Sequence, residues 1–224
     1  MSEQLITVGE ATQRLGVTSN LPANKCLTKG EFDELVAQIP ELAPNGVYIM
    51  HKDRFLVKKE NWTYSNEEAS GVAVKTDNCA FVMAKEEHTS IPWGGMAILI
   101  NCCVTTTNEL TAKSDYRGKQ NTDAIVTQLG TGEMYAARYC NEFTFAHGVK
   151  GYLPALGELC EAYKSKIEID ACMSTIGGTN FLDNCNRWSS TQYTENRVWL
   201  YYEDEIFSDD KIYDYYARPF AAFQ

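Results

Sequence analysis

The arrangement of hydrophobic and polar positions predicts a short helix near the start of the chain. Thr28-Lys29-Gly30-Glu31 has the spacing of a capping box, in which Thr and Glu satisfy the first backbone N–H groups of a helix. The apolar residues that follow have helical spacing, namely Phe32, Leu35, Val36 and Ile39. Pro40 ends this pattern. We therefore expect an amphipathic helix over residues 29–39, preceded by an extended polar stretch up to Cys26.

From Val47 onward the pattern changes to short runs that are typical of strands. The predicted strands cover residues 47–50, 55–57, 71–75 and 79–84. Thr76-Asp77-Asn78 separates the last two as a hairpin turn. We place a domain boundary near residue 45, so that residues 1–44 form an N-terminal segment and residues 45–224 form the main domain.

Two helical patterns occupy the middle of the chain. Asn121 or Thr122 caps the first, which carries Ile125, Val126 and Leu129 and whose pattern extends past Gly130 toward Cys140. Pro154 starts the second, and Gly177-Gly178 stops it. The apolar stripe of this second helix consists of Leu156, Leu159, Tyr163 and Ile167.

Strand patterns return over residues 187–192, 197–202 and 217–223. The order of strands, two helices and strands predicts an α+β fold and not an alternating parallel sheet.

Composition and charge narrow the range of functions. The 224 residues are 44% hydrophobic, which is enough to bury one sizeable core. A net charge of −10 would repel a phosphate backbone, so we expect no nucleic-acid partner. No window approaches the roughly 20 apolar residues that a membrane span needs, so we expect no membrane insertion. The first residues lack the basic and apolar regions of a signal peptide, and we expect synthesis in a cytoplasm.

The eight cysteines and three histidines do not form a chemical motif. Cys-x-x-Cys is absent, so zinc-ribbon and redox sites lack their usual spacing, and reduced, buried thiols are expected. Gly-x-Ser-x-Gly and His-Glu-x-x-His are also absent. His51, His88 and His147 lie far apart in sequence. We expect no catalytic residues and no cofactor.

A series of short motifs carries a family resemblance. In chain order they are GYLPALGEL at 151–159, Gly177-Gly178, WSSTQ at 188–192, Trp199 and ARPF at 217–220. This series resembles the C-type-lectin-like domains related to the formylglycine-generating-enzyme and Legionella collagen-like-protein C-terminal families. Such domains are common in gut bacteria and their phages, including the crAss-like group. The likeness spans roughly residues 45–224.

The resemblance implies a C-type-lectin-like domain, with mixed antiparallel strands and two helices, in which the motif residues have structural roles. They are Leu153, Pro154, Glu158, Trp188, Ser189, Ser190, Trp199 and Arg218. Physical reasoning agrees, because Leu153-Pro154 suits a helix start and the two tryptophans suit core faces of adjacent strands. The enzyme branch of the related fold uses two reactive cysteines. Cys172 and Cys185 are the nearest here, but their surroundings do not match that motif.

The late part of the chain mixes tyrosines with acids and provides the candidate ligand-binding residues. Between Glu195 and Asp214 the sequence has seven acidic residues and only two basic ones, Arg197 and Lys211. The acidic residues are Glu195, Glu203, Asp204, Glu205, Asp209, Asp210 and Asp214. Oxygen-rich loops bind calcium, so calcium stays an open alternative, although the spacing fits no EF-hand loop. Tyrosines in such a loop can stack on sugar rings or fill pockets of a protein. A solvated hairpin with one buried row of tyrosines fits equally well. The candidates are Tyr193, Glu195, Asn196, Arg197, Tyr201, Tyr213 and Tyr215.

These observations favour a non-enzymatic bacteriophage fibre or decoration protein. In this hypothesis residues 1–44 attach the chain to other virion proteins, and the lectin-like domain binds a glycan or protein of the host surface. A fibre gains avidity from cyclic symmetry, so we expect a homo-oligomer located in the virion. The alternatives are a bacterial surface adhesin and an enzyme of the formylglycine-generating type.

Overall fold

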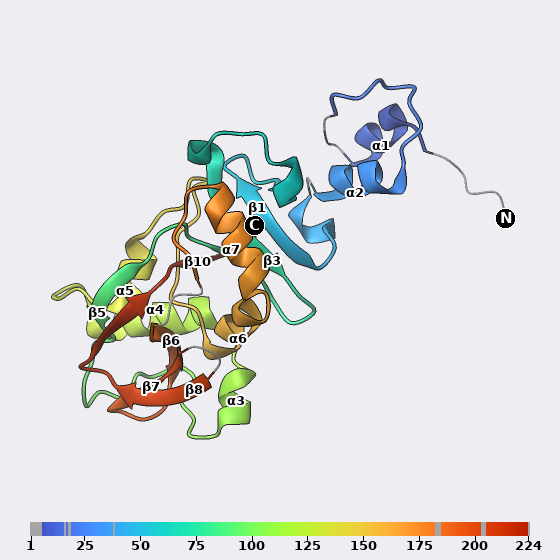
Figure 1. Cartoon of the computed structure of the whole chain (residues 1–224). Coiled ribbons are helices and arrows are strands. Elements are labelled where there is room, and N and C mark those ends of the chain that lie inside the picture. Colours follow the sequence, from blue (N-terminus) through green and yellow to red (C-terminus); the bar gives the residue numbers. More distant parts are fainter. Residues whose placement is uncertain are drawn as a thin grey trace.

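The chain folds into two five-stranded sheets flanked by helices, as the computed structural model of residues 6–15, 17, 19–37, 39–181, 185–202 and 205–223 describes (Figure 1). The helices are α1 (Val8–Leu15), α2 (Lys29–Ala37), α3 (Glu109–Lys113), α4 (Gly118–Leu129), α5 (Ala136–Glu142), α6 (Leu156–Lys164) and α7 (Lys166–Thr175). The 3₁₀ turns are η1 (Pro40–Leu42), η2 (Lys59–Asn61) and η3 (Asn66–Glu68). The predicted α+β class is confirmed. Across the described ranges, no helix combines the length and apolar character needed to cross a membrane.

The N-terminal part is a small helical unit that projects from one end of the molecule (Figure 1) and is joined to η2 by a hydrogen bond from Asn61 Nδ2 to Glu34 Oε1 at 2.8 Å. The predicted helix is confirmed as α2, and Thr28 and Glu31 form the expected capping box. The expectation of extended chain up to Cys26 was wrong, because α1 occupies part of it. Thr7 and Glu10 cap α1 in the same way as Thr28 and Glu31 cap α2. The two helices share an apolar cluster built on Val8, Ala11, Leu27 and Leu35.

The first sheet has the order β10-β4-β3-β1-β2 and is covered on both faces. Its strands are β1 (Gly46–His51), β2 (Leu56–Val57), β3 (Ala69–Lys75), β4 (Ala80–Met83) and β10 (Phe220–Ala222). The four strands predicted in this part of the sequence are confirmed. One face packs on α6 and α7, and the other packs on residues 143–149. Consequently β1, β3 and β4 are buried along almost their whole length.

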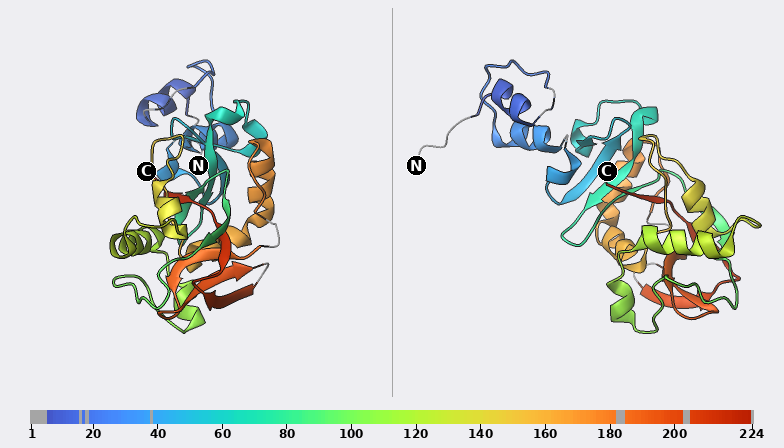
Figure 2. Two further views of the ribbon diagram at one scale, coloured as in Figure 1. Left: turned by 90° about the vertical axis from the view of Figure 1, so that its left-hand side faces the viewer. Right: turned by 180° about the vertical axis from the view of Figure 1, so that it is seen from behind.

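The second sheet has the order β5-β9-β6-β7-β8. Its strands are β5 (His88–Pro92), β6 (Arg187–Gln192), β7 (Arg197–Tyr202), β8 (Glu205–Asp210) and β9 (Asp214–Ala217). The predicted strands 187–192 and 197–202 are confirmed, whereas the predicted strand 217–223 is divided between β9 and β10. Of the pairings between the named strands in the described part of this sheet, β6 with β9 is parallel and the other three are antiparallel. Figure 2 shows α4 and α5 on one side of the strands and α6 and α7 on the other.

The first predicted middle helix is divided in two, and its start was misplaced. It begins at Gly118, and Asn121 and Thr122 are buried inside it instead of capping it. A side chain at Gly118 would collide with Tyr152 and Glu158, which explains the glycine. Gly130 ends α4 with a φ of 69°, a left-handed conformation that glycine adopts without strain.

The second predicted middle helix is also divided, at Ser165 between α6 and α7. Leu156, Leu159 and Tyr163 face the core as expected. Ile167 does not face the core: it lies beyond the break, in the first turn of α7, and is 74% exposed. Gly177 follows the end of α7 with a φ of 69°, which confirms its predicted role as a stop.

A buried ionic cluster joins segments from both sheets and from the loop after α7. Arg187 donates from Nε and Nη2 to the two oxygens of Glu87, each at 3.0 Å. Arg218 Nε donates to Glu87 Oε2 at 3.1 Å. All three side chains are 1% exposed. Burial by itself would raise the pKa of Glu87. The two guanidinium groups outweigh this effect and hold the pKa of Glu87 below its usual value.

We expect Glu87→Ala to destabilise the protein by about 3–5 kcal/mol, because it leaves two buried guanidinium groups without their carboxylate. Urea unfolding at neutral pH measures the loss. Glu86→Ala is the matched control, since Glu86 is the exposed neighbour. Equal stabilities of the two variants would contradict this role for the cluster.

Candidate binding groove

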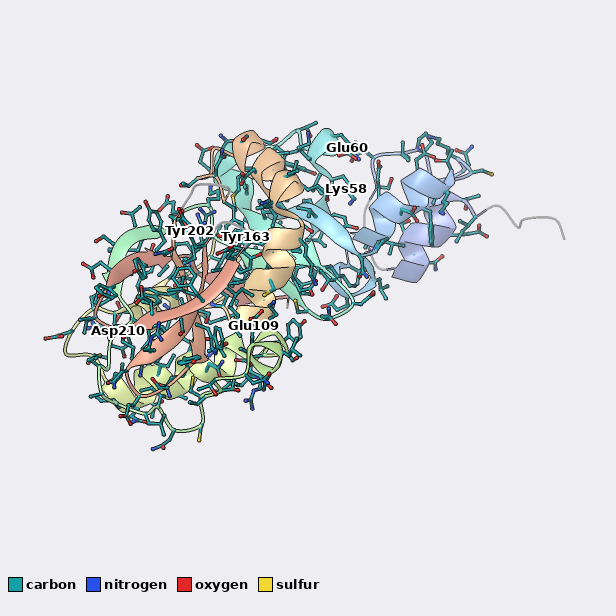
Figure 3. All side chains as sticks on the ribbon, turned by 60° about the horizontal axis from the view of Figure 1, so that its bottom comes forward. Lys58, Glu60, Glu109, Tyr163, Tyr202 and Asp210 are labelled. Atoms are coloured by element: carbon teal, nitrogen blue, oxygen red, sulfur yellow. The ribbon has the colours of Figure 1, made fainter. Side chains whose placement is uncertain are left out.

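The second sheet places the predicted ligand residues on two opposite faces. Successive residues of a strand point to alternate faces, and β7 pairs with β8 in continuous register from Arg197↔Asp210 to Tyr202↔Glu205. Tyr201 therefore shares a face with Arg197. Tyr215 belongs to the other face, where it packs with Leu200 and Phe207. Figure 3 shows Tyr202 and Asp210 well separated, as expected for opposite ends of the β7–β8 hairpin.

On the first face, most of the predicted residues already contact one another or the core. The Tyr193 ring meets Trp199 edge-on, with centroids 5.0 Å apart. Arg197 lies 5.6 Å from the Tyr193 ring centroid. Tyr201 stacks on Tyr163 of α6, with centroids 3.7 Å apart. This stacking fixes the position of Tyr201 beside α6.

On the other face, Tyr215 donates to Asp209 Oδ2 at 2.6 Å, and Tyr213 is 47% exposed beside it. Glu195 and Asn196 lie in the turn between β6 and β7. The seven predicted ligand residues therefore do not form a single site.

An open groove of about 620 Å³ lies on the side of the molecule where α3, α6 and the β7–β8 hairpin meet. Of the predicted ligand residues, only Tyr201 contributes to it. The groove is lined by Asn78, Glu109, Lys113, Tyr116, Cys160, Glu161, Lys164, Tyr201, Glu205 and Ile206. Figure 3 shows Glu109 and Tyr163 in this part of the molecule. The volume is within the range typical of small-molecule sites.

Charged groups of both signs form the polar part of the groove. Glu161 is 5% exposed, and its Oε1 accepts from Asn78 Nδ2 at 2.9 Å and from Lys164 Nζ at 2.7 Å. Burial opposes ionisation, but these donors hold the pKa of Glu161 below its usual value. Lys113 pairs with Glu109 at 2.5 Å. The groove thus offers both donors and acceptors to a polar ligand.

Aromatic and apolar groups form the rest of the lining. Tyr116 and Tyr201 are both half-buried, so part of each ring faces solvent. Cys160 is half-buried too, and burial raises the pKa of its thiol to about 11. This thiol is protonated at neutral pH, which makes it a weak nucleophile. Aromatic rings beside hydrogen-bonding groups are suited to non-covalent binding of a ligand with apolar and polar faces.

Sequence reasoning did not find the groove, because its walls come from distant segments. Asn78 was interpreted only as part of a hairpin turn, and Glu161 and Lys164 lie between the apolar positions of α6. Tyr116 precedes α4 without a motif. The helical spacing of Glu161 and Lys164 was a usable signal that they share a face, but nothing in the sequence pointed to the hairpin opposite them.

The motif residues of β6 mainly bond to backbone groups. Trp188 Nε1 donates to Ile91 O at 2.9 Å, and Ser189 Oγ donates to Trp199 O at 2.6 Å. Ser190 is 0% exposed and its Oγ accepts from Asn121 Nδ2 at 3.3 Å. Trp199 Nε1 donates to Thr106 O at 2.8 Å.

The LPALGEL motif forms the start of α6. Leu153 is buried, and its N–H donates to Thr122 Oγ1 at 2.9 Å. Pro154 O accepts from the N–H of Ser190 at 2.7 Å. Glu158 accepts from Ala155 N at 2.7 Å and from Tyr152 OH at 2.9 Å. Arg218 belongs to the ionic cluster with Glu87.

In the described part of the chain, no three His, Cys, Asp or Glu side chains gather where they could hold a metal ion. Within the acidic run, Asp210 lies 3.7 Å from Arg197, and Asp209 accepts from Tyr215. Glu203 and Asp204 lie outside the described residues. Cys172 and Cys185 are buried, and burial raises the pKa of Cys172 to about 11.

Comparison with solved structures finds a similar fold in a fimbrial protein from Bacteroides ovatus ATCC 8483. The TM-score is 0.61 at 14% sequence identity, and the match covers 80% of this chain and 49% of that chain. This chain therefore matches about half the length of that protein. No family model and no curated protein matches the sequence. The chain thus shares an α+β fold with a surface-appendage protein, and this likeness does not extend to the narrower C-type-lectin-like assignment.

Glu158 predicts a pH dependence of stability. Burial raises its pKa to about 8 from an ordinary 4.5, so between these values the folded protein holds a proton that the unfolded chain has released. The contribution of Glu158 to stability should fall by about 1.4 kcal/mol for each pH unit across this interval. Glu158→Gln removes this titration, and we expect the variant to gain stability relative to the native chain as the pH rises from 5 to 8.

Urea unfolding at a series of pH values measures this difference. Glu161→Gln is the matched control on the same helix, because the pKa of Glu161 is shifted downward. A stability difference between Glu158→Gln and the native chain that stays constant with pH would contradict a buried, protonated Glu158.

Proposed function

We propose that this chain is a non-enzymatic structural subunit of a surface appendage and that its groove binds a ligand on a host surface. The observation that carries the proposal is the fold shared with a fimbrial protein over 80% of the chain. Fold alone does not define function, so the groove supplies the second argument. It combines two tyrosine rings with paired charges, a composition suited to recognition.

The contacts in the groove favour binding over catalysis. Its most buried carboxylate, Glu161, is held by Asn78 and Lys164, and its thiol, Cys160, has a raised pKa. The Ser70–His147 pair, with 2.5 Å between Oγ and Nδ1, lines no part of the groove. Burial lowers the pKa of His147 to about 4, which makes it a weak general base at neutral pH.

In its narrower form, the proposal is a bacteriophage fibre with a C-type-lectin-like domain. The series of motifs between residues 151 and 220 supports this form. The α1–α2 unit, with its own apolar cluster, would attach the subunit to other virion proteins, and the groove would face a host glycan or protein. A homo-oligomer would increase the avidity of a weak single site.

A second candidate is a subunit of a bacterial surface appendage, which the fimbrial neighbour favours. Immunogold electron microscopy of purified phage particles and of bacterial cells that carry the gene distinguishes the two. Label on a particle fibre supports the phage form. Label on cell-surface filaments alone supports the bacterial form, and label on neither contradicts both.

Binding by the groove is tested with the purified full chain on an immobilised array of bacterial surface glycans. We expect Lys113→Glu and Tyr116→Ala to weaken binding about tenfold or more, because they change a charge and a ring of the groove. Lys119→Glu is the matched control, since Lys119 and Lys113 both belong to exposed i,i+4 ion pairs. Unchanged binding by both groove variants would show that the ligand binds elsewhere.

A further inference from the structure

Exposed apolar side chains concentrate in two segments that meet beyond the end of β8. Of the ten large apolar side chains that are exposed among the described residues, five lie in these segments. We call these five side chains the apolar patch. They belong to Met96, Ile98, Leu99, Ile212 and Tyr213, and each residue is between 39% and 58% exposed. Lys211, which precedes Ile212, donates to Ile98 O, so the two segments are neighbours on the surface. Large exposed apolar patches on a protein surface mark interaction sites.

The patch lies away from the groove. Residues Glu205 and Ile206 of β8 line the groove, whereas Ile212 follows the other end of this strand, at Asp210. Five residue steps along a strand correspond to about 17 Å. The two surfaces can therefore be tested independently.

Lys211 fixes the two segments of the patch to each other. Its side chain is fully buried, and Nζ donates to Ile98 O at 2.7 Å, to Gln192 Oε1 at 2.8 Å and to Gly95 O at 3.4 Å. The ammonium group also lies 4.5 Å from the centroid of the Trp93 ring. Three acceptors for three N–H groups make Lys211 a clamp between the two segments.

The loop that carries Met96, Ile98 and Leu99 has a specific backbone. Ala97 and Cys102 have φ values of 59° and 63°, in the left-handed region that non-glycine residues rarely adopt. Such conformations persist where the surrounding structure fixes them, and they are concentrated at binding sites. Gln128 contributes by donating to Leu99 O at 2.9 Å and accepting from Asn101 N at 2.9 Å.

The charges around the patch define the chemistry of its partner. Glu195 and Asp214 are exposed nearby, and Asp210 precedes Lys211. Of the neighbouring cations, Lys211 is buried in the clamp and Arg197 is 3.7 Å from Asp210. The rim is therefore acidic. A second copy that approached with the same patch would bring the same acidic rim, and the two rims would repel each other.

We propose that the apolar patch is a docking surface for a partner protein that presents apolar side chains surrounded by Lys and Arg. Apolar contact at the centre supplies the affinity, and the acidic rim selects and orients the basic partner.

Selection of a random peptide library on the immobilised full chain tests this proposal. We expect enriched peptides that combine apolar residues with Lys or Arg, and binding of a synthesised peptide that weakens with added salt. The patch variant combines Ile98→Ser, Leu99→Ser and Ile212→Ser. It should bind this peptide about tenfold or more weakly.

The matched control combines Leu42→Ser and Ile167→Ser, which remove exposed apolar side chains outside the patch. It should bind as the native chain does, and unchanged thermal unfolding shows that both variants fold. Three results would overturn the proposal: no enrichment of apolar–basic peptides, equal binding by patch and control variants, or self-association of the native chain that the patch variant abolishes.

Discussion

The arrangement of the two sheets depends on the shared carboxylate of Glu87. Two buried guanidinium groups with one carboxylate leave an excess positive charge, which is costly in a protein interior unless every donor finds an acceptor. Arg187 also donates from Nη1 to Tyr163 OH at 2.8 Å, and Arg218 donates from Nη1 to the carbonyl oxygen of Thr179 at 3.0 Å. The cluster thereby ties the segment before β5 to α6, β6, the loop after α7 and the chain between β9 and β10. No hydrophobic contact would fix these segments with the same directionality.

A second buried polar network explains how β6 can be both hydroxyl-rich and fully buried. Asp115 accepts from Asn121 Nδ2 and from Thr191 Oγ1, both at 2.8 Å, and Thr191 Oγ1 accepts from Leu156 N at 2.9 Å. This network holds the starts of α4 and α6 against one strand. The groove follows from it, because α6 provides one wall and the hairpin that continues from β6 provides the other. The motif residues of this strand do not line the groove, and they support its walls from behind.

Local patterns predicted the elements whose causes are local. The capping box at Thr28 defined α2, and short runs of apolar residues that include Val, Ile, Tyr or Phe defined β1, β3 and β4, because these signals lie within a few neighbouring residues. Asn121 was misinterpreted as a helix cap because its side chain bonds Asp115 and the N–H of Val104 instead, a tertiary choice that spacing does not reveal. The tyrosine-rich run indicated recognition surfaces. In the folded sheet these predicted ligand residues lie on different faces and at different positions along the strands. Only Tyr201 among them lines the groove.

The position of β8 at the edge of the second sheet has a consequence for assembly. An edge strand presents backbone groups that can pair with another chain, and charged side chains are a common protection against such pairing. β8 carries Glu205, Asp209 and Asp210 within six residues. These acids disfavour unspecific pairing with a second copy of an acidic chain. They also leave the two ends of β8 as distinct surfaces, a polar groove at Glu205 and an apolar patch beyond Asp210. We therefore expect contacts at this part of the molecule to use side chains more than backbone pairing. The chemistry of side chains can select one partner over another, whereas backbone groups are the same in every chain.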